Sequence, residues 1–221
     1  MNSTVVVTGA NRGIGLELCR CYVNNGDAVF AVCRNSSEDL DALKVNVIKG
    51  VDVTDAGSVA GLRDRLQSES IDILINNAGI FTLETLANMD FAAIEKQLQV
   101  NAIGPLRVTY ALLGLLSHRA KIALITSRMG SVEDNTSGGY YGYRMSKAAL
   151  NAVGMSLARD LKDRGVPVGI FHPGFVQTRM VDFAGDISAE EAATRLVKRI
   201  EELDIGNSGT FRHSNGEELP W

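Results

Sequence analysis

The stretch Thr4-Val5-Val6-Val7-Thr8-Gly9-Ala10-Asn11-Arg12-Gly13-Ile14-Gly15 decides the fold of this chain. Its β-branched run predicts a strand, and a helical pattern follows directly after a loop with three glycines. Gly9 permits a tight turn, Gly13 lets backbone N–H groups approach a pyrophosphate, and Gly15 lets the helix pack close to the sheet. The N-terminus of that helix adds free amides and a partial positive charge. The spacing is GxxxGxG rather than the commonest dinucleotide-binding pattern GxGxxG, so an ordinary glycine-rich turn is the alternative.

The rest of the chain alternates short apolar runs with longer stretches of helical periodicity. Several short runs are apolar throughout, as expected of strands covered on both faces. The pattern predicts an α/β Rossmann fold, a single domain over residues 1–221 with a doubly wound parallel sheet of about seven strands and helices on both faces. The expected strands are Thr4–Thr8, Ala28–Cys33, Val45–Lys49, Ile71–Asn76, Lys121–Thr126, Pro167–Phe171 and Gly209–Arg212. The expected helices lie near 13–25, 37–43, 55–68, 88–117, 143–163 and 189–203.

Composition narrows the possible classes of function. The chain has 221 residues, a formal net charge of −4 and no basic run, which argues against nucleic acid as a partner. The N-terminus lacks a signal-peptide pattern, and no stretch approaches the roughly 18 apolar residues of a membrane span. The three cysteines lack metal-ligand or CxxC spacing, which predicts reduced thiols and a cytoplasmic location. His118, His172 and His213 also lack ligand spacing, so no metal is expected.

Several motifs together resemble the classical short-chain dehydrogenase/reductase family. Thr8–Gly15 resembles its cofactor loop, Asn76–Gly79 its NNAG motif and Pro173-Gly174 its PG motif, while Asp52-Val53 matches the pair that usually meets adenine. The run YGYRMSKAALN and the segment Thr210–Trp221 resemble the C-factor and carbonyl-reductase branch. The resemblance implies an oxidoreductase that uses a nicotinamide cofactor. The residues that it places at the cofactor are Gly9, Asn11, Arg12, Gly13, Ile14, Gly15, Arg34, Asp52, Val53, Asn77, Ala78, Gly79, Tyr143, Lys147, Pro173, Gly174, Val176 and Thr178.

The end of the second expected strand favours NADP(H) over NAD(H). NAD-selective sites commonly place a carboxylate there, which accepts a hydrogen bond from the ribose 2′-hydroxyl. Here the sequence reads Val32-Cys33-Arg34-Asn35, with no acid before Glu38. Arg34 could pair with a 2′-phosphate, and Arg12 in the glycine loop offers a second cation. Two solvated surface arginines are the alternative.

Three tyrosines crowd before an alanine-rich run, and only Tyr143 lies four residues before Lys147, on the same face of a helix. A lysine about 5 Å away, at an effective dielectric of ~20, favours the phenolate by roughly 3 kcal/mol, or about two pKa units. The family's YxxxK signature matches Tyr143 and Lys147, and the resemblance implies that Tyr143 is the general acid toward a carbonyl oxygen. A helix-start tyrosine beside a surface lysine is the alternative. Tyr140 and Tyr141 are expected to pack or to line the pocket.

A serine should hold the substrate oxygen. Ser127, at the end of the fifth expected strand, resembles the family serine, whose hydroxyl donates to the substrate carbonyl and to the developing oxyanion. The 16 residues from Ser127 to Tyr143 exceed the usual family spacing by a few. Ser131 is the competitor.

The fourth catalytic candidate is Asn101. Pro105 has no N–H and cannot bond the carbonyl of Asn101, so a helix kink should leave that carbonyl free to bind a water. The resemblance implies a proton relay from Tyr143 through a ribose hydroxyl, Lys147 and this water to Asn101. A purely structural kink is the alternative.

Residues 179–188 are expected to form a short lid over the substrate. Met180, Val181 and Phe183 on this segment, with Phe81 and Val132 from neighbouring loops, suggest a pocket for a small hydrophobic aldehyde or ketone. Each of these side chains could equally belong to the core.

Two functions follow from these features. The first is NADPH-dependent reduction of such a carbonyl compound, or oxidation of the alcohol, and the second is a cofactor-binding signalling or regulatory protein of the C-factor type. An intact set of Ser127, Tyr143 and Lys147 favours the enzyme. A homodimer or homotetramer built on helices 88–117 and 143–163 is also expected, because small residues surround much of the second helix.

Overall fold

The computed structural model describes residues 2–221 and contains a seven-stranded sheet in which every neighbouring pair is parallel. The strand order is β3-β2-β1-β4-β5-β6-β7, which extends the order of a doubly wound Rossmann fold by one strand. The predicted fold class is confirmed. The strands are β1 (Thr4–Thr8), β2 (Ala28–Val32), β3 (Asn46–Ile48), β4 (Ile71–Asn76), β5 (Leu116–Ile125), β6 (Val168–His172) and β7 (Phe211–His213).

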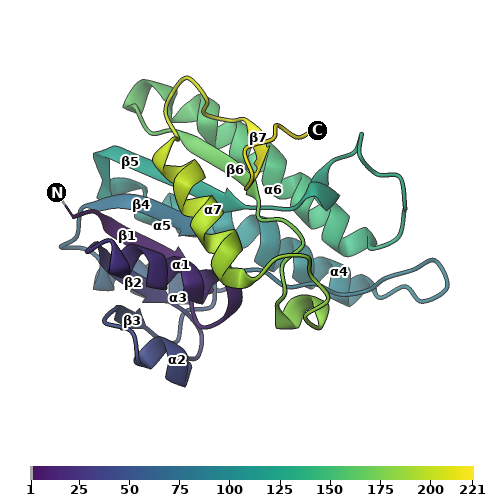
Figure 1. Cartoon of the computed structure of the whole chain (residues 1–221), viewed down its shortest axis with the longest axis horizontal. Coiled ribbons are helices and arrows are strands. Elements are labelled where there is room, and N and C mark those ends of the chain that lie inside the picture. The colour runs from purple at the N-terminus through teal and green to yellow at the C-terminus, as the bar shows by residue number, and fades with distance from the viewer. Residues whose placement is uncertain (1) are drawn as a thin grey trace.

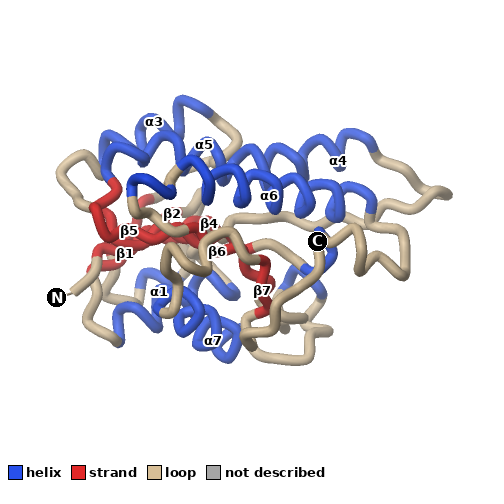
Figure 2. The backbone as a smooth tube through the Cα atoms, turned by 90° about the horizontal axis from the view of Figure 1, so that it is seen from above, coloured by secondary structure: helices blue, strands red, loops and turns tan. Residues whose placement is uncertain are grey.

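Helices cover both faces of the sheet (Figures 1 and 2). The helices are α1 (Gly13–Asn24), α2 (Glu38–Asp41), α3 (Ala56–Arg65), α4 (Phe91–Leu98), α5 (Gly104–Leu112), α6 (Tyr141–Asp160) and α7 (Ala189–Glu201). Figure 2 shows α3, α4, α5 and α6 in one layer, with α1 and α7 on the opposite face. The loop that leads into α4 projects from one end of the molecule (Figure 1). Within residues 2–221, no helix combines the length and the apolar character that crossing a bilayer requires.

The valine run of β1 is buried from both sides. Val6 belongs to the core cluster that contains Leu112 of α5, whereas Val5 and Val7 belong to the cluster that contains Leu196 of α7. This division arises because successive side chains of a strand point to opposite faces of the sheet. A strand covered on both faces therefore needs apolar residues at every position, as the sequence shows here.

The strand order reverses between β1 and β4. Val6 pairs with Phe30 of β2 on one side and with Leu74 of β4 on the other. The carboxyl ends of parallel strands meet at one edge of the sheet, and ligands bind beyond that edge near such a switch point. The glycine loop follows β1, the NNAG segment follows β4 and Ser127 follows β5. The topology therefore brings the predicted site residues to one edge.

The expected helix 88–117 is broken into shorter pieces. α4 passes into a π-helical turn over Gln99–Ile103, after which the amide of Gly104 donates to the carbonyl of Gln99. Pro105 follows at once and has no N–H for the helical pattern, which accounts for the disruption at this point.

The start of β5 also differs from the prediction, because the strand begins at Leu116 rather than at Lys121. The register with β4 shifts between Ile71 and Ile73, so this first part of the strand is irregular and lacks a clear periodic signal. Other boundaries, such as the two ends of α6 at Tyr141 and Asp160, differ by up to three residues, because element ends are poorly specified by local sequence.

Candidate active site

The glycine loop after β1 adopts the conformation that its sequence predicts. Gly9 and Gly13 have φ angles of 67° and 54°, in the left-handed region that favours glycine. A Cβ on Gly15 would lie 2.2 Å from the carbonyl oxygen of Gly9, so the first turn of α1 packs directly on the loop. The N-cap residue Arg12 makes no side-chain cap hydrogen bond. The first backbone amides of α1 are therefore available to an anion.

The NNAG segment after β4 closes onto this loop. The amides of Asn77 and Ala78 donate to the Thr8 hydroxyl at 3.0 and 3.1 Å. Asn77 Nδ2 donates to the carbonyls of Thr8 and Gly9 at 3.1 and 3.2 Å. These bonds fix the ends of β1 and β4 relative to each other and leave a shared surface at the switch point.

Two cations stand beside the loop. Arg12 and Arg34 are exposed, and neither forms an ion pair with any described residue in 2–221. Hydrogen bonds from Thr54 hold the pKa of Asp52 below its usual range, and the nearby Arg34 guanidinium adds to this effect. Val53, the next residue, is buried. Arg34 and Asp52 therefore lie close to each other, as expected if both face one end of a dinucleotide.

Tyr143 and Lys147 lie one turn apart near the start of α6. The Lys147 ammonium nitrogen is 5.7 Å from the centre of the Tyr143 ring. It donates to the carbonyl of Ile125, at the end of β5, at 2.9 Å, and Lys147 is only 5% exposed. Ser127 follows two residues after Ile125, and its hydroxyl is close enough to Tyr143 to act against the rise in the pKa of the phenol. The structure thus brings these three predicted residues together.

The electrostatic prediction for Tyr143 is wrong for the protein chain by itself. Burial raises the pKa of Tyr143 to about 12, and the Ser127 hydroxyl acts in the opposite direction. The cause that dominates is burial of the phenol, and it outweighs any effect of the ammonium of Lys147, 5.7 Å from the ring centre. Burial also lowers the pKa of Lys147 to about 8, because the charged form loses hydration. Tyr143 therefore keeps its proton at neutral pH and is available as a proton donor.

Asn101 lies fully buried within the π-helical turn. Its Oδ1 accepts from the amide of Ile80 at 2.8 Å, and its Nδ2 donates to the carbonyl of Ile80 and to Ser146 Oγ, both at 2.9 Å. A Cβ on Gly79 would lie 3.4 Å from Asn101 Oδ1 and 3.9 Å from Lys147 Nζ. The side chain of Asn101 therefore joins Ile80, the residue after the NNAG segment, to α6. Its backbone carbonyl is the group that the predicted relay would use.

Ser131, the competitor of Ser127, is engaged elsewhere. Its hydroxyl donates to the carbonyl of Trp221 at 2.9 Å. The same carbonyl accepts from the backbone amides of residues 132 and 133 at 2.7 and 3.0 Å. Trp221 thus holds the loop after β5, and the geometry favours Ser127 as the partner of Tyr143.

The segment after β6 reaches back to the glycine loop. Gly174 has a φ of 103°, and the carbonyl of Pro173 accepts from Ser214 Oγ at 2.8 Å. A Cβ on Gly13 would lie 3.3 Å from Thr178 Cγ2. The predicted PG run therefore lies against the same edge as the loop after β1.

Residues 179–188 form a compact excursion from this run. Val176 and Ile187 make a parallel bridge, which closes the segment at its base. Met180 and Phe183 are 42% and 62% exposed, so these two side chains are not core residues. They are free to contact a ligand at the edge of the sheet.

Aromatic rings gather beside Tyr143. Phe81 meets the Tyr143 ring edge-on, with centroids 4.9 Å apart, and stacks on Tyr140 at 5.7 Å. Val132, by contrast, is 80% exposed and lines a separate apolar hollow of about 360 Å³ between α6 and Trp221. Of these two predicted pocket residues, Phe81 is therefore the one that contacts the site.

Sequence reasoning missed Glu84 and Gln97, which are both buried at the start of α6. The amide of Gly142 donates to Glu84 Oε2 at 3.2 Å, and Gln97 Nε2 lies 3.3 Å from both carboxylate oxygens. A single glutamate in a polar loop is usually solvent-exposed, and no periodicity connects it with a helix 58 residues away. The sequence therefore carried no signal for this contact.

The end of β6 offers no competing acid. Burial lowers the pKa of His172 to about 3, and the neighbouring His213 acts in the same direction. The imidazole of His172 therefore stays neutral at physiological pH. Among residues 2–221, no group of three or more His, Cys, Asp or Glu side chains is arranged to hold a metal ion.

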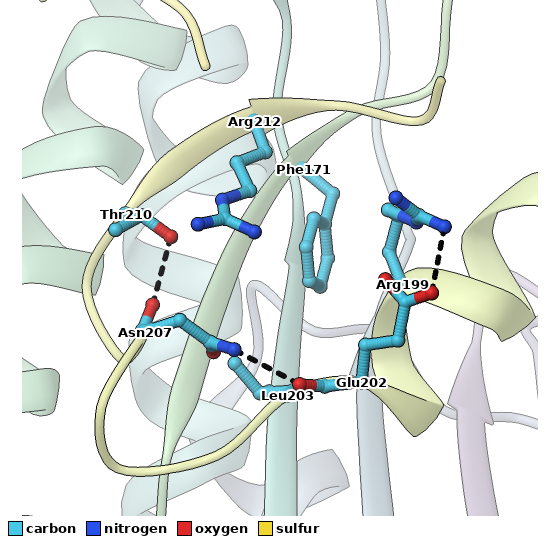
Figure 3. A pocket seen from close by; sticks show the side chains of 7 residues that line it. All are labelled: Phe171, Arg199, Glu202, Leu203, Asn207, Thr210 and Arg212. Carbon is cyan, nitrogen blue, oxygen red and sulfur yellow. Dashed lines mark hydrogen bonds and ion pairs between the residues drawn. The ribbon is translucent and has the colours of Figure 1, made fainter. Parts of the chain in front are cut away.

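A small cavity lies away from this edge, between β6, β7 and the end of α7 (Figure 3). Phe171, Arg199 and Arg212 stand on its wall, and its volume is about 10 Å³. That volume is close to the space of a single water molecule, so the cavity is too small for a substrate.

Comparison with known proteins agrees with this arrangement. The family model for short chain dehydrogenases matches residues 3–188. The chain belongs to the short-chain dehydrogenase family. As a member of this family it is an oxidoreductase, which agrees with a glycine loop, a tyrosine and a lysine at one edge of a Rossmann sheet.

This short-chain dehydrogenase is similar along most of its length to three proteins with different names. It is 42% identical to 1-hydroxy-2-glutathionyl-2-methyl-3-butene dehydrogenase of Rhodococcus sp. (strain AD45), covering 99% of this chain and 100% of that one. It is 42% identical to C-signal of Myxococcus xanthus over 68% of this chain and 93% of that protein. The structure of NADPH-bound carbonyl reductase from chicken fatty liver superposes with a TM-score of 0.90, at 28% identity and full coverage of both chains.

Replacement of Lys147 by Met should stabilise the protein near neutral pH. The pKa of Lys147 is lowered on folding, so charging it opposes folding below about pH 8, and this penalty disappears as the pH rises toward 10.5. The lowering of the Lys147 pKa corresponds to about 3 kcal/mol of lost folding free energy, which the substitution would recover. Loss of the hydrogen bond to the Ile125 carbonyl would offset about 1 kcal/mol of this gain. Urea unfolding should therefore show a gain of about 2 kcal/mol at pH 7 and a smaller gain at pH 10.

The exposed residue Lys44 provides a matched control. Lys44→Met should change the free energy of unfolding by less than about 0.5 kcal/mol at either pH. A Lys147→Met protein that is less stable than wild type at pH 7 would contradict the assigned cause.

Proposed function

We propose that this protein is an NADPH-dependent reductase of small hydrophobic aldehydes or ketones, which also oxidises the corresponding alcohols. The observation that carries the proposal is the convergence of Ser127, Tyr143 and Lys147 beside the glycine loop. The names of similar proteins support it, because they include carbonyl reductases and an alcohol-oxidising dehydrogenase.

The edge of the sheet fits NADP(H). Gly9 and Gly13 shape a cradle in which Cβ atoms would be strained, and the free amides of α1 would donate hydrogen bonds to the pyrophosphate. Arg12 and Arg34, which lack ion-pair partners within residues 2–221, would bind the 2′-phosphate. When bound, the cofactor supplies the hydride that the carbonyl carbon accepts. The other residues proposed to hold it are Asn11, Ile14, Gly15, Asp52, Val53, Asn77, Ala78, Gly79, Pro173, Gly174, Val176 and Thr178.

Tyr143 and Ser127 would act together on the substrate oxygen. Tyr143 is protonated at neutral pH, so it donates its proton to the oxygen as the carbon is reduced, and an alcohol results. The Ser127 hydroxyl donates a hydrogen bond to the same oxygen and stabilises the negative charge that develops there. Oxidation of the alcohol reverses these transfers, with the Tyr143 phenolate as the base.

Lys147 and Asn101 would support the proton donor. Lys147 holds a positive charge 5.7 Å from the centre of the Tyr143 ring at neutral pH, because its pKa of about 8 is still above 7. Asn101 holds the NNAG segment against Ser146, next to Lys147, and its carbonyl would bind the water that resupplies the proton. Both residues thus act on Tyr143 rather than on the substrate.

The proposed substrate is apolar because the side chains that we expect to contact it are apolar. Phe81 touches the Tyr143 ring, and Met180 and Phe183 are exposed on the segment 179–188, which we propose as a lid. None of these side chains would bind the hydroxyl groups of a sugar or the charge of an acid.

Tyr143→Phe should abolish carbonyl reduction while it preserves cofactor binding. Loss of the proton donor should lower kcat about 10²- to 10⁴-fold, because the phenyl ring keeps the contact with Phe81 but has no proton to transfer. NADPH oxidation with a panel of aldehydes and ketones measures kcat, and cofactor fluorescence measures NADPH affinity. Tyr110→Phe, at an exposed tyrosine of α5, is the control and should retain full activity. Turnover by Tyr143→Phe at the wild-type rate would exclude the proposed role.

Arg34→Ala should weaken the preference for NADPH over NADH. Loss of a charge-assisted contact with the 2′-phosphate should lower NADPH affinity about 10- to 100-fold and leave NADH affinity nearly unchanged. Titration of both cofactors by fluorescence tests this, with the exposed arginine variant Arg119→Ala as the control. Equal losses for NADPH and NADH would show that Arg34 does not read the phosphate.

A signalling role of the C-factor type is the second candidate, and the similarity to C-signal of Myxococcus xanthus supports it. The set of Ser127, Tyr143 and Lys147 favours an enzyme, because a protein that only binds the cofactor has no need of a proton donor beside Ser127. Cys19, Cys21 and Cys33 are free thiols. The cytoplasmic location that was expected from the spacing of these cysteines stays a prediction.

The outer face of the helical layer supports the predicted homodimer or homotetramer. Four large apolar side chains on this layer are at least 40% exposed. They are Ile103, just before α5, Leu106 and Tyr110 in α5, and Met145 in α6. The first three recur at helical spacing and form an apolar stripe, which a second copy of the chain would cover.

Tyr110→Glu should therefore convert the assembly to monomers, because a carboxylate would be buried at the contact. Light scattering of the wild type and the variant tests this. Ile205→Glu, which changes a partly exposed residue after α7, should leave the mass unchanged. A monomeric wild-type protein would refute the proposed assembly.

A further inference from the structure

The helix that carries Tyr143 and Lys147 is not capped by its own N-cap side chain. α6 begins after Tyr140, which has a φ of 53° and makes no side-chain cap hydrogen bond. Four other helices begin with such a bond. Their cap residues are Ser37 for α2, Asp55 for α3, Asp90 for α4 and Ser188 for α7.

Glu84 supplies the missing cap from the loop between β4 and α4. Its Oε2 accepts from the amide of Gly142 at 3.2 Å, and its backbone carbonyl accepts from the amide of Tyr140 at 3.0 Å. A Cβ on Gly142 would lie 2.2 Å from Gln97 Nε2 and 3.1 Å from Glu84 Oε2. Glycine at position 142 is therefore what allows this carboxylate to reach the first turn of α6.

The Glu84 carboxylate is buried and surrounded by hydrogen-bond donors. Its exposure is 1%, and it forms no ion pair with the residues of 2–221. The Thr82 hydroxyl and Gln97 Nε2 donate to it, in addition to Gly142. Gln97 is held in this orientation because its Oε1 accepts from the amide of Thr82 at 3.2 Å. Such a site suits an acceptor that carries negative charge at the positive end of a helix.

The same loop also contacts the tyrosine itself. Tyr143 is the third residue of α6, one position after Gly142. Phe81, three positions before Glu84, packs edge-on against the Tyr143 ring at 4.9 Å. Residues 81–84 therefore hold both the ring and the helical turn from which it projects.

We propose that Glu84 is a positioning residue for the reaction, which fixes the first turn of α6 so that the Tyr143 hydroxyl stays beside Ser127. This inference rests on the proposed function of Tyr143 as the proton donor. Glu84 contacts neither Tyr143 nor Lys147 through a side-chain hydrogen bond, so it acts through Gly142, Gln97 and Phe81.

Glu84→Gln tests this role with almost no change of shape. The new amide would place an NH₂ group against the fixed NH₂ group of Gln97 or against the amide of Gly142. We expect kcat for carbonyl reduction to fall at least tenfold, with NADPH affinity within twofold of wild type. Asp90→Asn, which alters the cap of the adjacent helix α4, should leave kcat unchanged.

An exchange of the two side chains should restore activity. When Glu84→Gln is combined with Gln97→Glu, the amide oxygen introduced at position 84 can accept from Gly142. The NH₂ group introduced there can donate to the carboxylate introduced at position 97, whose second oxygen can accept from the amide of Thr82. We expect kcat to return to within threefold of wild type, which a loss of packing alone would not produce.

The pH profile separates positioning from a direct effect of charge. If Glu84 acted only through its negative charge, Glu84→Gln would lower the apparent pKa of Tyr143, because the phenolate would lose a like charge. A positioning role predicts the opposite shift, since Ser127 is the group that lowers this pKa and its contact would be weakened. Alcohol oxidation, followed from pH 6 to pH 11, should therefore require a higher pH in the variant.

Wild-type kcat and an unchanged pH profile in Glu84→Gln would overturn the inference, as would a lowered apparent pKa. If that variant does not fold, Thr82→Val removes one donor from the carboxylate at similar volume and should lower kcat at least threefold. An unaffected Thr82→Val protein would then overturn it. Full activity of Tyr143→Phe would instead refute the proposed function, so the two failures are distinguishable.

Discussion

The burial of Lys147 at the end of β5 is the interaction on which the site depends. Its ammonium bonds the Ile125 carbonyl, and a Cβ on Gly130 would lie 2.7 Å from the Lys147 backbone. α6 is therefore pressed against the strand end that carries Ser127. Burial of the Lys147 ammonium lowers the stability of the fold, because its charged form loses hydration. In return, the side chain joins α6 to the end of β5. The position of Tyr143, one turn earlier in α6, follows from this contact.

The sequence predicted the parts of the site that depend on local geometry. The glycine loop, the parallel sheet and the pairing of Tyr143 with Lys147 follow from steric freedom, periodicity and the pitch of a helix. The ionisation of Tyr143 could not be predicted in this way. Its pKa depends on burial by loops that lie far away in sequence, and this effect exceeds that of the neighbouring lysine. The spacing of residues along a helix shows which side chains are neighbours, but it does not show how far they are shielded from solvent.

Long-range hydrogen bonds were also beyond the sequence. Glu84 serves a helix 58 residues later, and Trp221 binds Ser131 across 90 residues. Neither contact leaves a periodic pattern, because each joins a loop to an element of another part of the chain. The irregular start of β5 escaped prediction for a related reason, since its register shift breaks the alternation that identifies a strand. These features belong to tertiary packing rather than to local preference.

The remote cap of α6 has a consequence for the evolution of the preceding loop. Between Ser131 and Tyr140, the chain is mostly exposed and includes Gly138 and Gly139 with positive φ angles. A helix that took its cap from this loop would be disturbed by every insertion there. Because the cap comes from Glu84 instead, the loop can gain or lose residues without moving the helix start. A spacing of 16 residues between Ser127 and Tyr143 is accommodated in this way.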